Sequence, residues 1–398
     1  MAVKQPFWDS ADDVPRLPQS WQVLTTEEAC VQLKPGQLYD VRTAKTTGKV
    51  PILTQSETGY LGFHDAEPGV HASEQVPVVT FANHTCVLRL LRHPFSCIQN
   101  IFPKVGKPGL VDTLFYYYAC QGRVGTAEYK GHHPTFRKAL IPIPPLPVQR
   151  RIASILSAYD DLIENCERRI RLLDEMARAL YREWFVFLHY PGHEKTPLVD
   201  SPLGRTPKGW QAVPLSAVAQ VNARTLDVKR APSHIHYIDI SSVSPGRVDT
   251  VTKYAFADAP NRARRVVRHG DVLWSCVRPN RKSHVLILHP AEATIASTGF
   301  AVLTAEKVPA SFLYVATTSD EFVGYLEKRA TGAAYPAVTA QVFQDAPLLA
   351  PDSSVLTQFA AVVDPLAETI ALLNRRIENL RKTRDRLLPR LLSGQLSV

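Results

Sequence analysis

The densest group of side chains able to do chemistry in this sequence is a run of cations within residues 253–282. Eight Lys or Arg residues face only Asp258 and Asp271, a net charge of +6 in 30 residues. An apolar stretch at 271–277 is typical of a buried strand, so most of the cations should lie on the loops beside it. Arginine forks on a rigid scaffold suit phosphate contacts and bidentate hydrogen bonds to guanine. The candidate contacts are Arg262, Arg264, Arg265, Arg278, Arg281 and Lys282.

A thinner basic group lies in the first third of the chain. Lys45 and Lys49 belong to a Thr-rich loop, and Lys104 and Lys107 lie around two glycines. The whole chain is basic, with 46 Lys and Arg against 37 Asp and Glu and a net charge of +9. Basic clusters also occur on ordinary solvated surfaces, so charge alone leaves nucleic-acid binding and plain surface both open.

Motifs for catalysis or metal binding are missing from the sequence. There is no GxxxxGK[ST] loop, no GxGxxG after a strand, no HExxH, and no Asn-Pro-Pro or Asp-Pro-Pro tetrapeptide of the kind that amino-methyltransferases use. The close histidine pairs, at 132/133 and 234/236, lack a completing carboxylate or cysteine and are interpreted as surface turn and strand residues. Cys86 lies near His84, but nothing orients it as a nucleophile. We therefore expect no catalytic residue, no metal and no cofactor bound by this chain.

Composition indicates a globular protein of two to three domains. The chain has 398 residues, of which 45% are hydrophobic and 21% charged. Its six cysteines are scattered without a CxxC pair, which suits reduced thiols in the cytoplasm. No apolar run approaches the roughly 20 residues that span a bilayer, and residues 1–15 lack the apolar core of a signal peptide. We expect a cytoplasmic protein without a membrane segment.

The sequence also repeats itself. PQSWQ at 18–22 resembles PKGWQ at 207–211, an offset of 189, and RRI at 168–170 matches RRI at 375–377, an offset of 207. The second offset also aligns several other residues, such as Phe136 with Phe343 and Pro144 with Pro351. The difference between 207 and 189 gives the second copy 18 extra residues before its helix. These matches predict two copies of one unit, each a globular segment followed by a long helix.

Both long helices carry an apolar seam with alternating spacings of four and three, which is typical of a coiled coil. Only Arg384 interrupts the second seam, and Pro365 is expected near the start of its helix, where proline is least costly. Similar seams could face the core of an ordinary bundle, but two in one chain pair more naturally with each other. The seam residues are Ile152, Leu156, Ile163, Ile170, Leu173, Leu180, Val363, Ile370, Leu373, Ile377, Leu380 and Leu387.

The predicted fold is therefore two mixed α/β (α+β) domains separated by two long helices, with an internal pseudo-twofold axis. A first helix over 148–186 would span roughly 58 Å at 1.5 Å per residue. Residues 188–206, rich in Pro and Gly, could return along a parallel partner only if almost fully extended, so the pair should be antiparallel. The predicted segments are the first globular domain at 1–145, the first helix at 146–187, the linker at 188–206, the second globular domain at 207–352 and the second helix at 353–398.

Several motifs resemble the specificity (S) subunits of type I restriction-modification enzymes. The entry to the first helix, IPIPPLPVQRRIASIL at 141–156, is similar to the entry to the first conserved helix of that family. The recognition-domain motifs GDVL at 270–273 and ATG at 330–332 match more loosely. The remaining specific matches are YREWF at 181–185, TPKGW at 206–210 and LLPRLLSG at 387–394. The resemblance covers essentially all of residues 15–398.

This resemblance implies a function. Each globular domain would be a target-recognition domain that binds one half of a bipartite sequence in double-stranded DNA, and the coiled coil would set the unread spacer. Two methyltransferase subunits would dock on this chain, and restriction subunits would join them. Adenine methylation from S-adenosylmethionine and cleavage driven by ATP, with its Mg²⁺, would belong to those partners.

Two other classes of function remain as alternatives. A coiled-coil scaffold with two protein-binding domains is one alternative, but it would assign no function to the arginines of the loops. A DNA enzyme acting alone would need an active site that the missing motifs do not supply. One departure also limits the analogy: residues 60–110 show no clear counterpart of the segment 270–282, so half-site contacts cannot be copied between the two domains.

Overall fold

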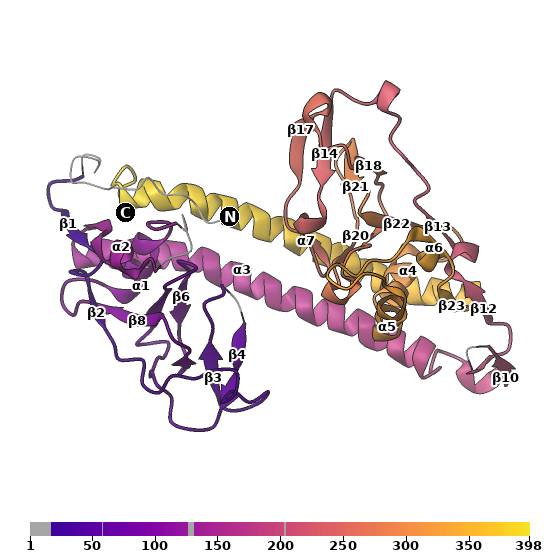
Figure 1. The fold of residues 1–398 in the computed structure, drawn as a ribbon, viewed down its shortest axis with the longest axis horizontal. Coiled ribbons are helices and arrows are strands. Elements are labelled where there is room, and N and C mark those ends of the chain that lie inside the picture. The colour runs from indigo at the N-terminus through magenta and orange to yellow at the C-terminus, as the bar shows by residue number, and fades with distance from the viewer. Residues whose placement is uncertain (1–16, 58, 126–130, 203) are drawn as a thin grey trace. The chain divides into compact units, whose positions relative to one another are not determined.

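The computed structural model describes residues 17–57, 59–125, 131–202 and 204–398 (Figure 1). Their contacts divide the chain into two compact units. Unit 1 comprises Met1–Glu164 with Glu378–Val398, and unit 2 comprises Asn165–Ile377. Both divisions fall inside long helices, because α3 covers Leu146–Tyr181 and α7 covers Ser353–Leu392. The expectation about a signal peptide concerns residues 1–15, which lie outside the described residues.

Unit 1 contains two main sheets. The larger has the strand order β2-β8-β5-β6 with antiparallel pairs, and the smaller has the order β4-β3-β7, in which β3 and β7 are parallel. A separate pair, β1 and β9, joins the start of the unit to the entry of α3. The elements are β1 (Gln22–Thr25), β2 (Cys30–Gln32), β3 (Val50–Leu53), β4 (Tyr60–His64), β5 (Val78–Ala82), β6 (Leu88–Leu91), β7 (Ser96–Cys97), β8 (Ile101–Gly106), α1 (Thr113–Cys120), α2 (His133–Lys138) and β9 (Leu140–Ile143).

The core of unit 1 forms where helix α1 packs on the larger sheet. Every residue of β5 is buried, as expected for the apolar run VVTFA in a central strand. Asp112 caps α1 by accepting a hydrogen bond from the Phe115 backbone N–H at 2.9 Å. Parts of both long helices join this core. Its buried members include Phe81, Phe115, Phe136, Ile152, Leu156, Leu388 and Leu391.

Unit 2 also contains two four-stranded sheets. One has the order β13-β22-β19-β20 and the other β17-β14-β21-β18, in which β14 and β21 are parallel (Figure 1). The strands are β10 (Leu198–Ser201), β11 (Gly204–Pro207), β12 (Gln211–Pro214), β13 (Ala219–Val221), β14 (His234–Ile238), β15 (Val243–Ser244), β16 (Arg247–Val248), β17 (Thr252–Ala255), β18 (Ala263–Val266), β19 (Val272–Ser275), β20 (His284–Leu286), β21 (Thr294–Ser297), β22 (Phe300–Ala305) and β23 (Pro347–Ala350).

Three short helices complete unit 2: α4 (Ala310–Thr317), α5 (Asp320–Arg329) and α6 (Ala340–Gln344). Ser319 caps α5, whose first turn is acidic and whose last turn is basic, as the helix dipole favours. The fully buried Trp274 of β19 belongs to the main core of the unit. That core also takes side chains from the end of α3, the π-helical turn Arg182–Val186 and the start of α7, including Ala177, Phe185, Val355, Phe359 and Val363.

None of the twelve predicted seam residues is exposed. Where the second seam is interrupted, Arg384 forms an ion pair with Asp160 of α3 inside unit 1. Burial lowers the pKa of Arg384, but the Asp160 carboxylate outweighs that effect, so the pKa is raised overall. Tyr118 donates a second hydrogen bond to Asp160 at 2.6 Å. Arg384 is therefore a paired residue of this seam.

Several sequence expectations need correction. Pro365 is the thirteenth residue of α7 and not near its start, so it removes a hydrogen bond from the helix interior. Residues 188–206, predicted as a linker, contain part of the β10–β11 hairpin. Strand β6 begins at Leu88, after Cys86 adopts a left-handed turn conformation with φ of 56°.

Helix α7 also corrects the statement about apolar runs. By length and composition it is apolar enough to cross a membrane, with a hydropathy of 1.4 over its best window. Phe359 and Val363 from this stretch are buried in the core of unit 2, where they would be unavailable to lipid. Of that window, 22% is buried among the described residues, so only part of it packs into the core.

Candidate nucleic-acid interface

The loop between β19 and β20 presents three of the six cations that the sequence singled out within residues 253–282. Ser275 and Ser283 close it through a backbone hydrogen bond of 2.9 Å, and residues 276–282 lie between them. Arg278 and Lys282 both adopt left-handed backbone conformations, with φ of 52°. These unusual conformations flank the short helical turn Pro279–Arg281. Because such conformations are costly outside glycine, the loop is held by its surroundings.

A second loop, residues 330–339, supports the first. The Arg278 backbone N–H donates to Pro336 O at 2.7 Å, and its guanidinium donates to Ala334 O at 3.2 Å. The same guanidinium lies 4.5 Å from the ring centre of Tyr335, whose residue is 69% exposed. Stacked arginine and tyrosine planes are suited to contact with nucleotide bases and phosphates. The sequence motif ATG at 330–332 marked this loop, but Tyr335 itself was missed.

Backbone hydrogen bonds join these loops to the ends of neighbouring strands. Val338 N donates to Cys276 O, and Cys276 N donates to Gly299 O, both at 2.9 Å. Thr298 N in turn donates to Arg262 O at 2.8 Å. We call these connected residues the loop edge of unit 2: 262, 276–282, 298–299 and 330–338. The loop edge brings Arg262, Arg278, Arg281 and Lys282 onto one connected framework.

The cations of the loop edge differ in their availability. Arg262 forms an ion pair with Asp239 at 2.6 Å, and Lys282 forms one with Asp320 at 2.8 Å. Arg281 is exposed, and no described residue forms an ion pair with its guanidinium. Arg278 makes its hydrogen bond to a neutral carbonyl. Arg278 and Arg281 therefore keep their charges unneutralised.

Arg264 and Arg265 lie away from the loop edge, on strand β18. The pairing of β18 with β21 shifts register between Ala263 and Arg265, so Arg264 occupies a bulge. Arg264 donates to the neighbouring Ala263 O at 2.8 Å, and Nε of Arg265 is buried. These two cations belong to the strand surface, so the structure does not group them with Arg278 and Arg281.

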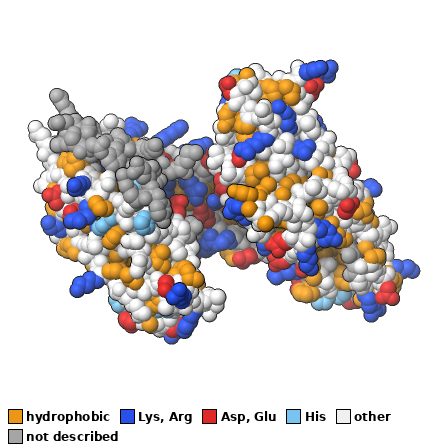
Figure 2. All heavy atoms as spheres, viewed as in Figure 1, with side chains coloured by type: hydrophobic (Ala, Val, Ile, Leu, Met, Phe, Trp, Pro, Cys, Tyr) orange, Lys and Arg blue, Asp and Glu red, His pale blue; other side chains and the backbone are white. Residues whose placement is uncertain are grey.

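In unit 1 the predicted cations are dispersed. Lys45 forms an exposed ion pair with Asp65 at 3.0 Å, and the Lys49 backbone donates to the same carboxylate at 3.3 Å. Lys107 is exposed on the turn after β8. Figure 2 shows Lys and Arg side chains scattered among acidic and hydrophobic ones on the visible face of each unit. Net basicity therefore does not form a single patch on these faces.

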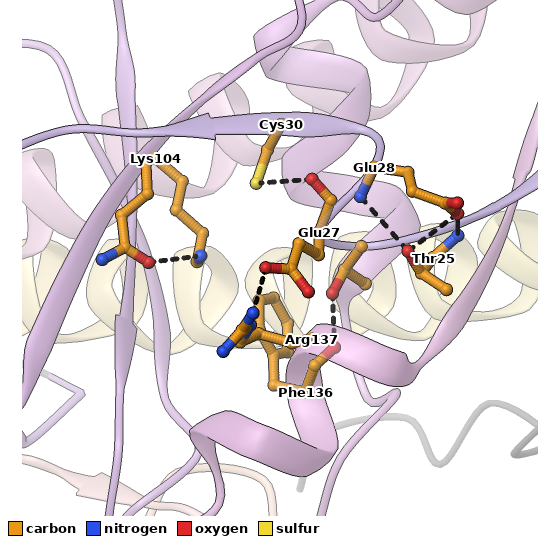
Figure 3. Close-up of polar contacts among 9 residues, drawn as sticks. Thr25, Glu27, Glu28, Cys30, Lys104, Phe136 and Arg137 are labelled. Atoms are coloured by element: carbon orange, nitrogen blue, oxygen red, sulfur yellow. Dashed lines mark hydrogen bonds and ion pairs between the residues drawn. The ribbon is translucent and has the colours of Figure 1, made fainter.

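Lys104, a predicted DNA contact, is not at the surface. It lies in β8, is 2% exposed, and its Nζ donates to Oε1 of Gln32 at 3.1 Å (Figure 3). Burial lowers the pKa of its ammonium group. The neighbouring charged pair, Glu27 and Arg137, lies near it on the same side of the unit. A buried ammonium cannot reach a phosphate, so Lys104 is not a DNA-contact candidate.

The hairpin loop of unit 1 has different chemistry. Ala82 N donates to Val87 O at 2.9 Å, and the four residues 83–86 lie between them. Asn83 is the centre of this loop: its N–H donates to Asn100 O at 2.9 Å, and its side-chain oxygen accepts from the His133 N–H at 2.8 Å. The His84 N–H donates to Oε1 of Gln55 at 2.9 Å. Neutral amide and imidazole groups thus occupy this loop.

The cysteine and histidine interpretations are partly corrected. Burial raises the pKa of Cys86 to about 11, which leaves the thiol protonated and unfit as a nucleophile. His132 is buried, and His133 stacks on Phe102 with ring centres 3.6 Å apart, so neither is a surface turn residue. A further group, His269, His289 and Glu368, comes together only in the fold. Its members are up to 99 residues apart in sequence, so no short sequence motif could indicate this group.

Comparisons with known proteins give a consistent result. Residues 98–174 match the model of the type I restriction modification DNA specificity domain. The type I restriction enzyme MjaIX specificity subunit of Methanocaldococcus jannaschii is 23% identical over 328 residues, which cover 78% of this chain and 74% of that protein. The HindI specificity subunit of Haemophilus influenzae is 22% identical over 43% of this chain and 39% of that protein.

A solved structure extends the similarity to the fold. The S subunit of a type I restriction-modification system from M. genitalium superposes with a TM-score of 0.59 at 15% identity, covering 95% of this chain and 99% of that one. At this identity the match supports the arrangement of mixed α/β domains with long helices. Residues 98–174 thus resemble the type I restriction modification DNA specificity domain, and over most of its length the chain is similar to the specificity subunits of type I restriction enzymes.

Proposed function

We propose that this chain is the DNA-recognition subunit of a type I restriction-modification complex. The observation that carries the proposal is sequence similarity to specificity subunits over 78% of the chain. Each unit would bind one half of a bipartite target in double-stranded DNA. In unit 2 the loop edge would make the contact, with Arg278 and Arg281 as the principal cations and Tyr335 as a stacking surface.

The internal repeat is supported by matching strand connections in the two units. The order β2-β8-β5-β6 in unit 1 corresponds to β13-β22-β19-β20 in unit 2, and each sheet is antiparallel throughout. The second sheets also correspond, because β3 pairs with β7 in parallel just as β14 pairs with β21. β1 with β9 corresponds to β12 with β23, at offsets of 189 and 207 residues. We infer two copies of one unit related by a pseudo-twofold axis.

This correspondence supplies the missing counterpart of the segment 270–282. Strand β19 aligns with β5, so the cationic loop 276–282 aligns with the neutral loop 83–86. The supporting hydrogen bonds also correspond: Asn83 N to Asn100 O matches Cys276 N to Gly299 O, each at 2.9 Å. By this correspondence, residues 78–91 of unit 1 would be the counterpart of the segment 270–282, which the sequence alone did not reveal. The two loops hold equivalent places and differ in composition.

An antiparallel coiled coil of α3 and α7 is supported by the contacts inside each unit. In unit 1, Ile152 and Leu156 near the start of α3 share a core with Leu391 near the end of α7. In unit 2, Ala177 near the end of α3 shares a core with Val363 in the first half of α7. We propose that the paired helices set the spacer between the two half-sites.

The remaining roles follow from the same proposal. Two methyltransferase subunits would dock on this chain, with restriction subunits beyond them. S-adenosylmethionine, ATP and Mg²⁺ would be bound by those partners, because no nucleotide or methyltransferase motif occurs in this sequence. The chain would thus act in the cytoplasm as a non-catalytic subunit of an enzyme complex.

The test is single-molecule methylation sequencing of genomic DNA from the native host, with and without this gene. We expect an asymmetric bipartite methyladenine motif that disappears on deletion and returns on complementation. Co-purification of the tagged chain with a methyltransferase subunit tests the partner assignment. An unchanged methylome together with absence of such a subunit would contradict the proposal and favour a protein-binding scaffold.

A further inference from the structure

Three side chains from separate parts of unit 2 meet at a point where both sheets connect. His269 lies in the connection from β18 to β19, and His289 lies in the connection from β20 to β21. Each of these connections passes from one sheet to the other. Glu368 projects from α7 toward them, and its carboxylate lies 2.9 Å from Nε2 of His289. The two imidazole rings are 4.8 Å apart, centre to centre.

We propose that His269, His289 and Glu368 form a binding site for a transition-metal ion of the Zn²⁺ class. One ring nitrogen of each histidine and one carboxylate oxygen all lie within 4.8 Å of one another. Ligands of one tetrahedral zinc ion are about 3.4 Å apart, given bonds of about 2.0–2.1 Å. Small side-chain rotations would close that difference, and both histidines are exposed and free to make them.

The donor set specifies the class of ion. Two imidazoles and one carboxylate suit zinc and neighbouring divalent metals, whereas magnesium and calcium prefer oxygen ligands alone. An open cavity of about 400 Å³ adjoins the histidines and is lined by residues 266–269 and 289–294. A three-ligand site beside such a cavity leaves room for water as a fourth ligand.

The backbone at this point also supports a built site. His289 adopts a left-handed conformation with φ of 50°, which an ordinary side chain rarely takes. Its N–H donates to Nδ1 of His269 at 3.2 Å, so the two connections are already joined without an ion. A bound ion would replace the proton shared between His289 and Glu368 and would fix both connections to α7.

Unit 1 shows what an equivalent contact looks like without metal ligands. Glu368 and Asp161 are 207 residues apart, the offset of the repeated helices. Asp161 accepts from the Arg92 guanidinium at 3.4 Å, and Arg92 precedes His93-Pro94 as Leu288 precedes His289-Pro290. An arginine cannot lose its proton to bind metal. In unit 1 the contact between a sheet connection and the long helix is thus an arginine–carboxylate ion pair. In unit 2 the equivalent contact consists of side chains that can bind a metal ion.

The test is a titration of the full-length chain, freed of metal by a chelator, with Co²⁺ and Zn²⁺. We expect one equivalent of Co²⁺ to give visible absorption bands of a low-coordinate site, which Zn²⁺ displaces. His269→Ala, His289→Ala and Glu368→Gln should each weaken binding at least tenfold. His234→Ala removes an exposed histidine of the same unit and should leave binding unchanged.

Folding of each variant is checked by circular dichroism in the presence of chelator, where no metal effect operates. If His289→Ala misfolds, the His269→Ala variant provides the test of metal binding, because the His269 side chain is exposed and its removal should not disturb folding. Equal binding by the native chain and by the folded His269→Ala variant would overturn the proposal. So would the absence of any Co²⁺ spectrum in the native chain, which would leave His289 and Glu368 as an ordinary hydrogen-bonded contact.

Discussion

The hairpin loops of the two units differ in composition although they follow strands in sheets of matching order. The loops connect corresponding strands, β5 with β6 and β19 with β20, and each is held by a 2.9 Å backbone hydrogen bond to the residue just before β8 or β22. The loop of unit 1 has four residues, 83–86, and none is a Lys or Arg. The loop of unit 2 has seven residues, 276–282, with three cations. The strands that support the two loops have the same order, and the difference lies in the length and side chains of the loops.

The difference between the loops predicts different modes of binding. Arginine forks in unit 2 suit guanine and phosphate oxygens. The amide and imidazole groups of Asn83 and His84 suit neutral hydrogen bonds, although both already have partners within the unit. The two half-sites should therefore differ in sequence, and the half bound by unit 2 should depend more strongly on salt.

The largest effect should come from removing both free cations of the unit 2 loop. Arg278→Ala with Arg281→Ala should weaken specific DNA binding by the methyltransferase complex about 100-fold, because a bidentate base contact contributes about 1–3 kcal/mol. The matched control is Lys282→Ala, whose ammonium is already neutralised by Asp320. Fluorescence anisotropy on the native site measures both. Equal losses in the double variant and the control would contradict the assignment.

The two units also differ where the long helices pair. Arg384 and Asp160 form an ion pair in unit 1, while the residues at the corresponding positions in unit 2, Ala177 and Ala367, are alanines. Both charged side chains are about 30% exposed, so we expect Arg384→Ala to cost about 1–2 kcal/mol, less than a fully buried pair. Hydrogen exchange should show the loss in unit 1 only. Uniform loss across both units would mean that the pair acts globally.

A further prediction concerns the effect of acid on stability. His284 in unit 2 is 2% exposed, and burial lowers its pKa to about 3. Because the unfolded imidazole has a pKa near 6.5, the unfolded state binds the extra proton, and stability should fall as pH drops from about 6.5 toward 3. Melting curves at pH 7.5 and pH 5 should show this loss, and His284→Phe should reduce it. Identical pH dependence in the variant would exclude His284 as its source.

The smallest effect is expected at Lys104, for which the sequence and the structure disagree. Lys104→Met should leave DNA affinity within about twofold, because the ammonium is buried and bonded to Gln32. Lys107→Ala, at an exposed position in the same segment, should lower the slope of affinity against salt by about one if it contacts a phosphate. A larger loss in Lys104→Met than in Lys107→Ala, with folding intact, would reverse this assignment.

The long helices could be predicted from the sequence, whereas the loops could not, and the difference has physical reasons. A seam such as Ile152, Leu156 and Ile163 is periodic, so its burial can be anticipated from spacing alone. Lys104 sits in a strand where charge argues for exposure, and only tertiary packing around Gln32 buries it. The match between loops 83–86 and 276–282 was hidden because three inserted residues and different side chains leave no common motif.

Sites assembled from distant residues were also beyond sequence patterns. Arg278 was identified from its charge, but its partner Tyr335 lies 57 residues further on, in another loop. His269, His289 and Glu368 share no motif, and only the crossing of two sheet connections beside α7 brings them together. Local composition predicted the kind of chemistry, whereas the fold decided which side chains act together.

We propose that each unit determines one half of the DNA target independently of the other. The most direct test is methylation sequencing of a host strain whose gene carries Arg278→Ala and Arg281→Ala, compared with the native strain. We predict a motif in which one half keeps its sequence and the other becomes degenerate. A motif altered in both halves, or one that is unchanged at full methylation, would contradict this account.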